Sequence, residues 1–244
     1  MAPNTTATAP AAAPDLAEMV TAGTDALNDG DLRLALERFE AVVNTFPDRP
    51  EGHNNLGALY SSLGEYGKAE TCFDHVLDLL PENPNVRYNR GLVRSRQEKH
   101  DAARDDFQAV LKLTPNDPDT LNNLGVSDFM QGRLDEARRH FETALKVRPG
   151  YANAFLNLVD LAWQTDGADR AARMCGEFLA SHHDTEVQRR HLELQISAAR
   201  EHLQGALVAA DAVMVVDANP VVAAERERIV HALAAWHREA SAHG

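Results

Sequence analysis

The sequence of 244 residues has only two cysteines, has fewer basic than acidic residues and has no long apolar run. Two cysteines are too few for a disulfide framework, so we expect Cys72 and Cys175 to be buried, reduced thiols. No apolar run reaches the roughly 20 residues that cross a bilayer. The start of the chain lacks the basic and apolar regions of a signal peptide. We therefore expect a cytoplasmic protein without membrane insertion.

Acidic residues outnumber basic ones: the sequence has 37 Asp and Glu against 24 Lys and Arg, which gives a formal net charge of −13. A general nucleic-acid binder needs a basic face to neutralise phosphates. The charge therefore argues against a nucleic-acid partner and fits solubility and the steering of a protein partner.

Catalytic motifs are also missing from the sequence. It has no glycine-rich phosphate loop, no nucleophile elbow and no cysteine pairs with zinc-site spacing. Four histidines are close together in sequence but include no i, i+4 pair joined by a carboxylate: His182, His183, His191 and His202. We expect surface histidines, no metal, no cofactor and no enzymatic activity.

A repeat of 34 residues is the main feature that is present. Four residue types keep this step: Phe39, Phe73, Phe107 and Phe141; Pro47, Pro81, Pro115 and Pro149; Gly23, Gly57, Gly91 and Gly125; and Ala35, Ala69, Ala103, Ala137 and Ala171. With background proline usage of about 5%, the proline series alone has a chance of roughly one in ten thousand. A fixed period of this size predicts a solenoid of stacked units.

One unit, residues 50–83, reads as two antiparallel helices joined by short turns. Gly64 ends the first helical run and Pro81 ends the second. Gly57 is small where the two helices must approach closely, and Phe73 is large where the gap must be filled.

This pattern resembles the tetratricopeptide repeat family, which has small residues at positions 8, 20 and 27, aromatic residues at 11 and 24, and proline at 32. The resemblance implies an all-α, right-handed superhelical solenoid. It is strong over units 16–49, 50–83, 84–117 and 118–151 and weak over 152–185 and 186–219, so that the array spans 15–219. We expect a disordered Ala, Pro and Thr-rich tail at 1–14 and a capping helix with a tail at 220–244, whose apolar stripe includes Ile229, Leu233 and Trp236.

In this family the first helix of each unit lines a concave groove. Position 6 of four consecutive units is asparagine: Asn55, Asn89, Asn123 and Asn157. Asparagine offers both a donor and an acceptor to a peptide backbone. The series is similar to the asparagine ladder of O-linked N-acetylglucosamine transferases, although no transferase domain follows. The alternative is that these amides bond within the array.

The other expected groove residues are Asn54, Asn122, Leu92, Val126, Phe129 and Trp163. Phe129 and Trp163 are candidate anchors for an apolar side chain, and packing against the irregular sixth unit is the alternative for Trp163. The carboxylate clamp of chaperone-binding members is not expected, because its basic positions fall on Val20, Asn85 and Asn89.

Unit 84–117 carries arginines at positions that are usually apolar: Arg87, Arg90 and Arg94. A buried guanidinium needs a partner. Since Asp128 holds the same position as Arg94 in the next unit, we expect an ion pair between these two. The alternative is that the arginines bind an acidic partner.

The resemblance implies a non-catalytic scaffold or adaptor that binds an extended peptide or a partner helix. Two alternatives stay open. The chain is an accessory subunit or detached domain of a transferase-type enzyme, or it self-assembles as a homo-oligomer.

Overall fold

The computed structural model describes residues 15–216 and 220–242, without the side chains of 213–216 and 236–242. The expected tail at 1–14 and the side chain of Trp236 therefore lie outside the described residues. Over the described residues, all regular structure is α-helical, and no helix has the length and apolarity to cross a bilayer. The chain divides into two compact bodies, an N-terminal body up to Ala137 and a C-terminal body from Arg138.

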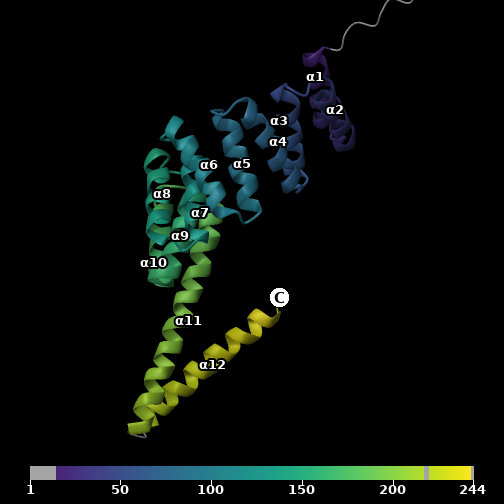
Figure 1. Cartoon of the computed structure of the whole chain (residues 1–244). Helices are drawn as coiled ribbons and strands as arrows, with labels where there is room; N and C mark the ends of the chain where they lie inside the picture. Colours follow the sequence, from purple (N-terminus) through teal and green to yellow (C-terminus); the bar gives the residue numbers. More distant parts are fainter. Residues whose placement is uncertain (1–14, 217–219, 243–244) are drawn as a thin grey trace, which may run out of the picture. The chain divides into compact units, whose positions relative to one another are not determined.

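The helices follow one another along the chain (Figure 1): α1 (Leu16–Asn28), α2 (Leu32–Thr45), α3 (Pro50–Ser62), α4 (Tyr66–Leu79), α5 (Pro84–Arg96), α6 (His100–Leu113), α7 (Pro118–Met130), α8 (Leu134–Val147), α9 (Ala152–Asp166), α10 (Ala168–Leu179), α11 (Thr185–Val216) and α12 (Pro220–Ala242).

In each helix pair of the N-terminal body, a glycine of the first helix lies directly against a phenylalanine of the second helix, and we call this contact the lock. A Cβ atom built on Gly57 of α3 would lie 2.7 Å from Cε1 of Phe73 of α4, closer than real side chains approach. Gly23 with Phe39 and Gly91 with Phe107 repeat this contact. The expectation that Phe73 fills the gap left by Gly57 is confirmed, and the contact explains why glycine recurs there.

The turn inside each repeat has one residue with left-handed backbone geometry. Gly30, Gly64 and Gly132 take this place with φ of 79°, 77° and 73°. Repeat 84–117 has Glu98 there instead, at φ 60°. A left-handed conformation costs a residue with a Cβ about 1–2 kcal/mol, so the turn of this repeat is strained where the others are not.

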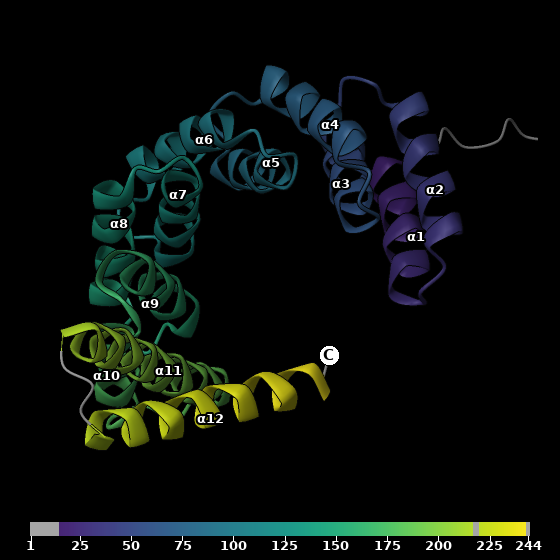
Figure 2. The ribbon, with the colours of Figure 1, turned by 90° about the horizontal axis from the view of Figure 1, so that it is seen from below.

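The N-terminal body has two layers of helices. Figure 2 shows α1, α3, α5 and α7 in one layer and α2, α4 and α6 in the other. Each second helix packs both on its own partner and on the first helix of the next repeat. The phenylalanines of the second layer are almost fully buried between these neighbours.

The repeat 152–185, which lies in the C-terminal body, carries its larger and smaller residues on the opposite helices. Val159 of α9 occupies the place of the glycine, and Cys175 of α10 occupies the place of the phenylalanine. Both are fully buried in one cluster with Phe155 and Phe178. The larger side chain has moved from the second helix to the first, so the total volume between the helices is kept.

Residues 186–219, where a degenerate sixth repeat was expected, form no helical hairpin, because residues 185–216 are the single helix α11. Two features that make a hairpin elsewhere are missing. Arg200 stands at the turn position, where glycine is usual, and Glu193 and Ala209 replace the glycine and phenylalanine of the lock. Gly205 alone costs a helix about 1 kcal/mol, which is too little to break it. Helix α12 follows and packs back along α11, with Ile229 buried (Figure 1).

Candidate binding surface

Three of the four position-6 asparagines lie in the N-terminal body, on α3, α5 and α7. Asn55 and Asn89 are half-buried, and their amides make no hydrogen bond to the described residues. Asn123 is also half-buried and donates from Nδ2 to the Tyr88 hydroxyl at 2.9 Å. Two amides are therefore open to a ligand, while the third has its donor engaged inside the array. Asn157 is half-buried on α9 of the C-terminal body.

The remaining expected groove residues differ in exposure. Leu92, Val126 and Phe129 are half-buried, and Asn54 is half-buried at a cavity between repeats. Asn122 is 7% exposed, so little of its side chain is open to a ligand in this structure.

Trp163 lies in the C-terminal body and contacts α11. The guanidinium carbon of Arg190 lies 4.7 Å from its ring centroid, and Arg190 is also paired with Asp160. Trp163 as a whole residue is 38% exposed. Trp163 thus packs against α11 on one side, as the alternative expected, and leaves part of its surface uncovered.

The expected ion pair between Arg94 and Asp128 is wrong. Arg94 donates to Glu70 at 2.8 Å and to Asp106 at 2.9 Å. Asp128 is fully buried and accepts from Nε of Arg104 at 2.8 Å.

The reason is the stacking register of the helices. Each first helix packs on the second helix of the preceding repeat, so position 11 meets position 21 of that repeat. Glu70 and Arg104 hold position 21 in successive repeats, and Arg94 and Asp128 hold position 11. The acidic residue therefore lies on the second helix in the Glu70–Arg94 pair and on the first helix in the Arg104–Asp128 pair. Arg133 adds a second donor to Asp128 at 2.8 Å.

A buried carboxylate gathers the arginines of α5. Asp106 is 2% exposed and accepts two hydrogen bonds from Arg90, at 2.6 and 3.0 Å, besides the one from Arg94. Arg87 donates to the carbonyl oxygen of Pro81 at 2.6 Å. All three guanidiniums have partners inside the array, although the partners of Arg94 are Glu70 and Asp106 and not the expected Asp128.

Glu70 is the most perturbed carboxylate of this network. Burial raises its pKa, but hydrogen bonds from Lys99, Arg94 and Gln97 outweigh burial and lower the pKa to about 2. These hydrogen bonds favour the ionised form of Glu70, and the bond from Arg94 holds α5 to α4.

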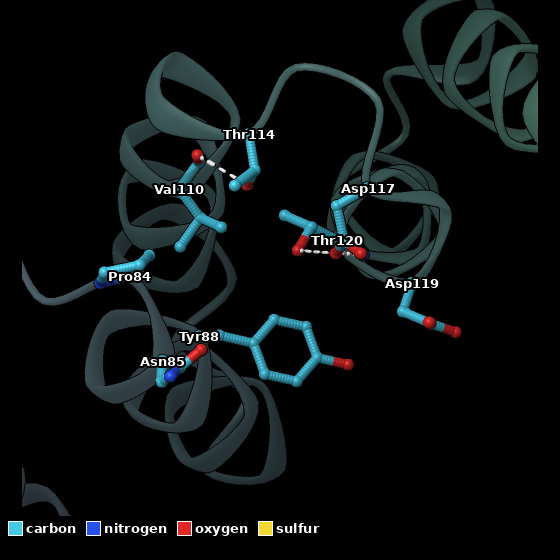
Figure 3. Close-up of a pocket in the computed structure, with 8 residues that line it drawn as sticks. All are labelled: Pro84, Asn85, Tyr88, Val110, Thr114, Asp117, Asp119 and Thr120. Carbon is cyan, nitrogen blue, oxygen red and sulfur yellow. Dashed lines mark hydrogen bonds between the residues drawn. The ribbon is translucent and has the colours of Figure 1, made fainter.

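Two cavities lie between successive repeats of the N-terminal body, with volumes of about 250 and 310 Å³. The first is built from residues 50–54, 76–83 and 85–86. The second, shown in Figure 3, is built from residues 84–88, 110–117 and 119–120. Each wall residue of one has its counterpart 34 residues along the chain in the other. We call them the 2/3 cavity and the 3/4 cavity, after the repeats that they separate.

Sequence reasoning singled out Asn54 of the 2/3 cavity as a groove residue but none of the residues that give the 3/4 cavity its character. Tyr88, Thr114 and Asp119 belong to the 3/4 cavity but lie at places with little family pattern. A comparison of consecutive repeats at the inter-repeat loop would have found them, because they replace Asn54, Leu80 and Asn85 of the 2/3 cavity.

The clustered histidines do not converge. His182 stacks on Phe178 at 4.4 Å, and His202 pairs with Asp169 at 2.8 Å. His191 lies beside Gly176 on another turn of α11. Within the described residues there is no group of three or more side chains able to hold a metal ion.

Comparison with known proteins connects these features to one family. Three family models, each described as tetratricopeptide repeat, match residues 50–83, 82–150 and 128–191. A search of the curated proteins finds no relative of this chain.

Several solved structures share the fold at low sequence identity. MamA from Desulfovibrio magneticus RS-1 is 22% identical with a TM-score of 0.65, covering 73% of this chain and 98% of its own. A tetratricopeptide repeat protein from Parabacteroides merdae is 20% identical with a TM-score of 0.66, covering 91% and 86%. YrrB, described as a protein with an unusual peptide-binding site, is 20% identical with a TM-score of 0.63, covering 76% and 92%.

Proposed function

Because the chain belongs to the tetratricopeptide repeat family, we propose that it is a non-catalytic adaptor that binds an extended segment of a partner protein. The binding surface is the layer of first helices in the N-terminal body. The carrying observation is that Asn55, Asn89 and Asn123 keep one position and stay half-exposed.

An extended segment fits this surface for a chemical reason. An asparagine amide donates to a backbone carbonyl and accepts from a backbone N–H, so a row of amides binds main chain without requiring particular side chains. Asn55 and Asn89 make no hydrogen bond to the described residues and offer both groups. The structural relative YrrB, whose description names a peptide-binding site, supports the same use of the fold.

The proposal is tested by replacing Asn55, Asn89 and Asn123 with alanine. Each hydrogen bond to backbone contributes about 0.5–1.5 kcal/mol net, so the triple variant should bind its partner at least about tenfold more weakly. Partners captured from a lysate by the wild type and lost by the variant would be identified by mass spectrometry. Their affinity would then be measured by calorimetry with purified material.

The matched control replaces one exposed residue at position 22 of three second helices, Glu37, Thr71 and Asp105, with alanine. It makes the same number of substitutions in the other layer of the same body. We expect it to bind like the wild type. Equal affinity of the asparagine variant and this control for the purified partner would disprove the proposal.

A further inference from the structure

A third cavity lies within the C-terminal body, between two helices that pack side by side (Figure 1), and we call it the α10/α11 cavity. Its volume is about 420 Å³, within the range of roughly 300–1,000 Å³ that small-molecule sites occupy. Its lining residues keep helical spacing, so that each helix contributes one face: Asp169, Ala172, Arg173 and Gly176 from α10, and His191, Gln195, Ala198, Ala199 and His202 from α11.

One end of this cavity is closed by a pair of side chains that leaves a neighbouring guanidinium unpaired. Nε2 of His202 lies 2.8 Å from Oδ2 of Asp169. Arg173 stands four residues after Asp169 on α10, a spacing at which a carboxylate and a guanidinium can pair. Asp169 is engaged by His202 instead, and the exposed Arg173 makes no ion pair or hydrogen bond to any described residue. A cationic donor is therefore available at the cavity.

The other end of the cavity presents an imidazole. A Cβ atom built on Gly176 would lie 3.4 Å from Cε1 and 3.9 Å from Nε2 of His191, so the ring lies over this glycine. Nδ1 of His191 is buried and has no hydrogen-bond partner among the described residues. Because a buried N–H without a partner is rarer than a buried unpaired acceptor, we place the proton of the neutral ring on Nε2. His191 then offers an N–H donor beside Gly176.

Three hydrogen-bond donors border the same stretch of the cavity. Arg173 lies one turn before Gly176 on α10, and Gln195 lies one turn after His191 on α11. Side chains three or four residues apart on a helix are neighbours. Gln195 is exposed, and its amide makes no hydrogen bond to the described residues. A carboxylate has about four lone-pair sites, so one carboxylate can accept from the guanidinium, the amide and the imidazole together.

The floor between the two ends is small and apolar. Ala172 is 8% exposed and Ala198 is 6% exposed. His191 and His202 stand 11 residues apart on α11, which corresponds to about 16 Å along the helix axis. A ligand whose charged group lies at Arg173 therefore has room for a short apolar body before it reaches the pair at the far end.

We propose that the α10/α11 cavity binds a small organic carboxylate. The carboxylate accepts from Arg173, His191 and Gln195, and the apolar body lies along the alanines. A hydrogen bond between charged groups is about twice as strong as a neutral one, so Arg173 contributes most of the recognition. This site goes beyond the proposed function, because it lies in the other body of the chain and takes a different class of ligand.

The test follows isotope-labelled histidine side chains of the full chain by NMR during titration with acetate, butyrate, butyramide or inorganic phosphate at constant ionic strength. The signal of His191 is identified by its loss in His191→Gln. Butyrate should shift this signal and bind at least about tenfold more tightly than the uncharged butyramide, which corresponds to about 1.4 kcal/mol. Acetate and phosphate lack the apolar body and should bind more weakly than butyrate.

Two substitutions on α10 separate the proposed contact from a general effect of charge. Arg173→Gln should weaken the binding of butyrate at least about tenfold. The control Arg170→Gln removes the same charge from an exposed residue of the same helix that does not line the cavity. It should bind butyrate like the wild type.

Equal affinities for butyrate and butyramide, or binding of acetate or phosphate as tight as that of butyrate, overturn the inference. It is also overturned if butyrate leaves the His191 signal unmoved, if its affinity survives in Arg173→Gln, or if Arg170→Gln reproduces the loss. None of these results bears on the proposed function, which is tested with the asparagine variant and its purified partner.

Discussion

Replacing Asp128 tests whether the ion pairs follow the stacking register of the repeats. Asp128 has no exposed surface and accepts from Arg104 and Arg133, whose side chains are 29% and 31% exposed. Removing one partner of a fully buried pair costs about 3–5 kcal/mol. Because both guanidiniums can turn partly into water, we expect Asp128→Ala to lower the free energy of unfolding by about 2–3 kcal/mol.

A double-mutant cycle identifies the partner. Arg104→Met with Asp128→Ala should show a coupling energy of at least about 1 kcal/mol, because the two side chains share a hydrogen bond. Arg94→Met with Asp128→Ala should be additive within about 0.5 kcal/mol, since Arg94 is paired with Glu70 and Asp106.

The assay must be local, because a repeat array does not unfold as one cooperative unit. Native-state amide exchange in α6 and α7 gives the opening free energy of the 3/4 interface, and circular dichroism checks that helix content is unchanged. A large coupling between Arg94 and Asp128, together with none between Arg104 and Asp128, would refute the register.

Three further predictions concern the lock, the turn and the pH dependence of the same body. Gly57→Ala should destabilise the α3–α4 pair by about 1–3 kcal/mol, because its methyl group would overlap the ring of Phe73; native-state amide exchange in α3 and α4 measures it, and unchanged protection there would contradict the lock. Glu98→Gly should raise the free energy of unfolding by about 1 kcal/mol by relieving the left-handed strain; a lower melting temperature would count against it. Burial, and then the charge of His75, lower the pKa of His53 below 6.5. The unfolded chain therefore binds a proton at His53 more readily than the folded chain does. The contribution of His53 to stability is complete above about pH 6.5 and falls as the pH drops below it. His53→Asn should therefore lose less stability than the wild type between about pH 6.5 and 5, in a series of melting curves.

The sequence predicts the two-helix repeat well, because the residues that recur every 34 positions include glycines that the backbone requires at those places. One glycine must face a phenylalanine, and a second must adopt a left-handed backbone conformation. Each recurs at its own position every 34 residues, so both are visible without a structure. Glu98 shows the limit of this reasoning. Its turn forms with an unfavourable residue because α5 and α6 pack as the other pairs do, so the tertiary contacts outweigh the local preference.

Side-chain partners were harder to predict, because they depend on which helix faces which. Equal phase suggested that Arg94 meets Asp128, but position 11 of each first helix faces the second helix of the preceding repeat instead of position 11 of its neighbour. The rule that joins position 11 to position 21 of the preceding repeat becomes available only with the packing. Once it is known, the reversal of sign between the Glu70–Arg94 and Arg104–Asp128 pairs can be read from the sequence.

That reversal has a consequence for how the repeats stack. If the first helix of repeat 118–151 were docked on repeat 50–83, Asp128 would face Glu70, and a buried carboxylate would meet a like charge. The correct order instead gives each buried charge an opposite partner. The apolar lock is the same in every repeat of the N-terminal body and cannot distinguish one neighbour from another, so the ion pairs supply the information that the phenylalanines and glycines lack. A variant with both signs exchanged at one interface, Glu70→Arg with Arg94→Glu, would give both interfaces the same order of signs at these two positions, but it would also set like charges against Asp106 and Lys99, which now pair with Arg94 and Glu70.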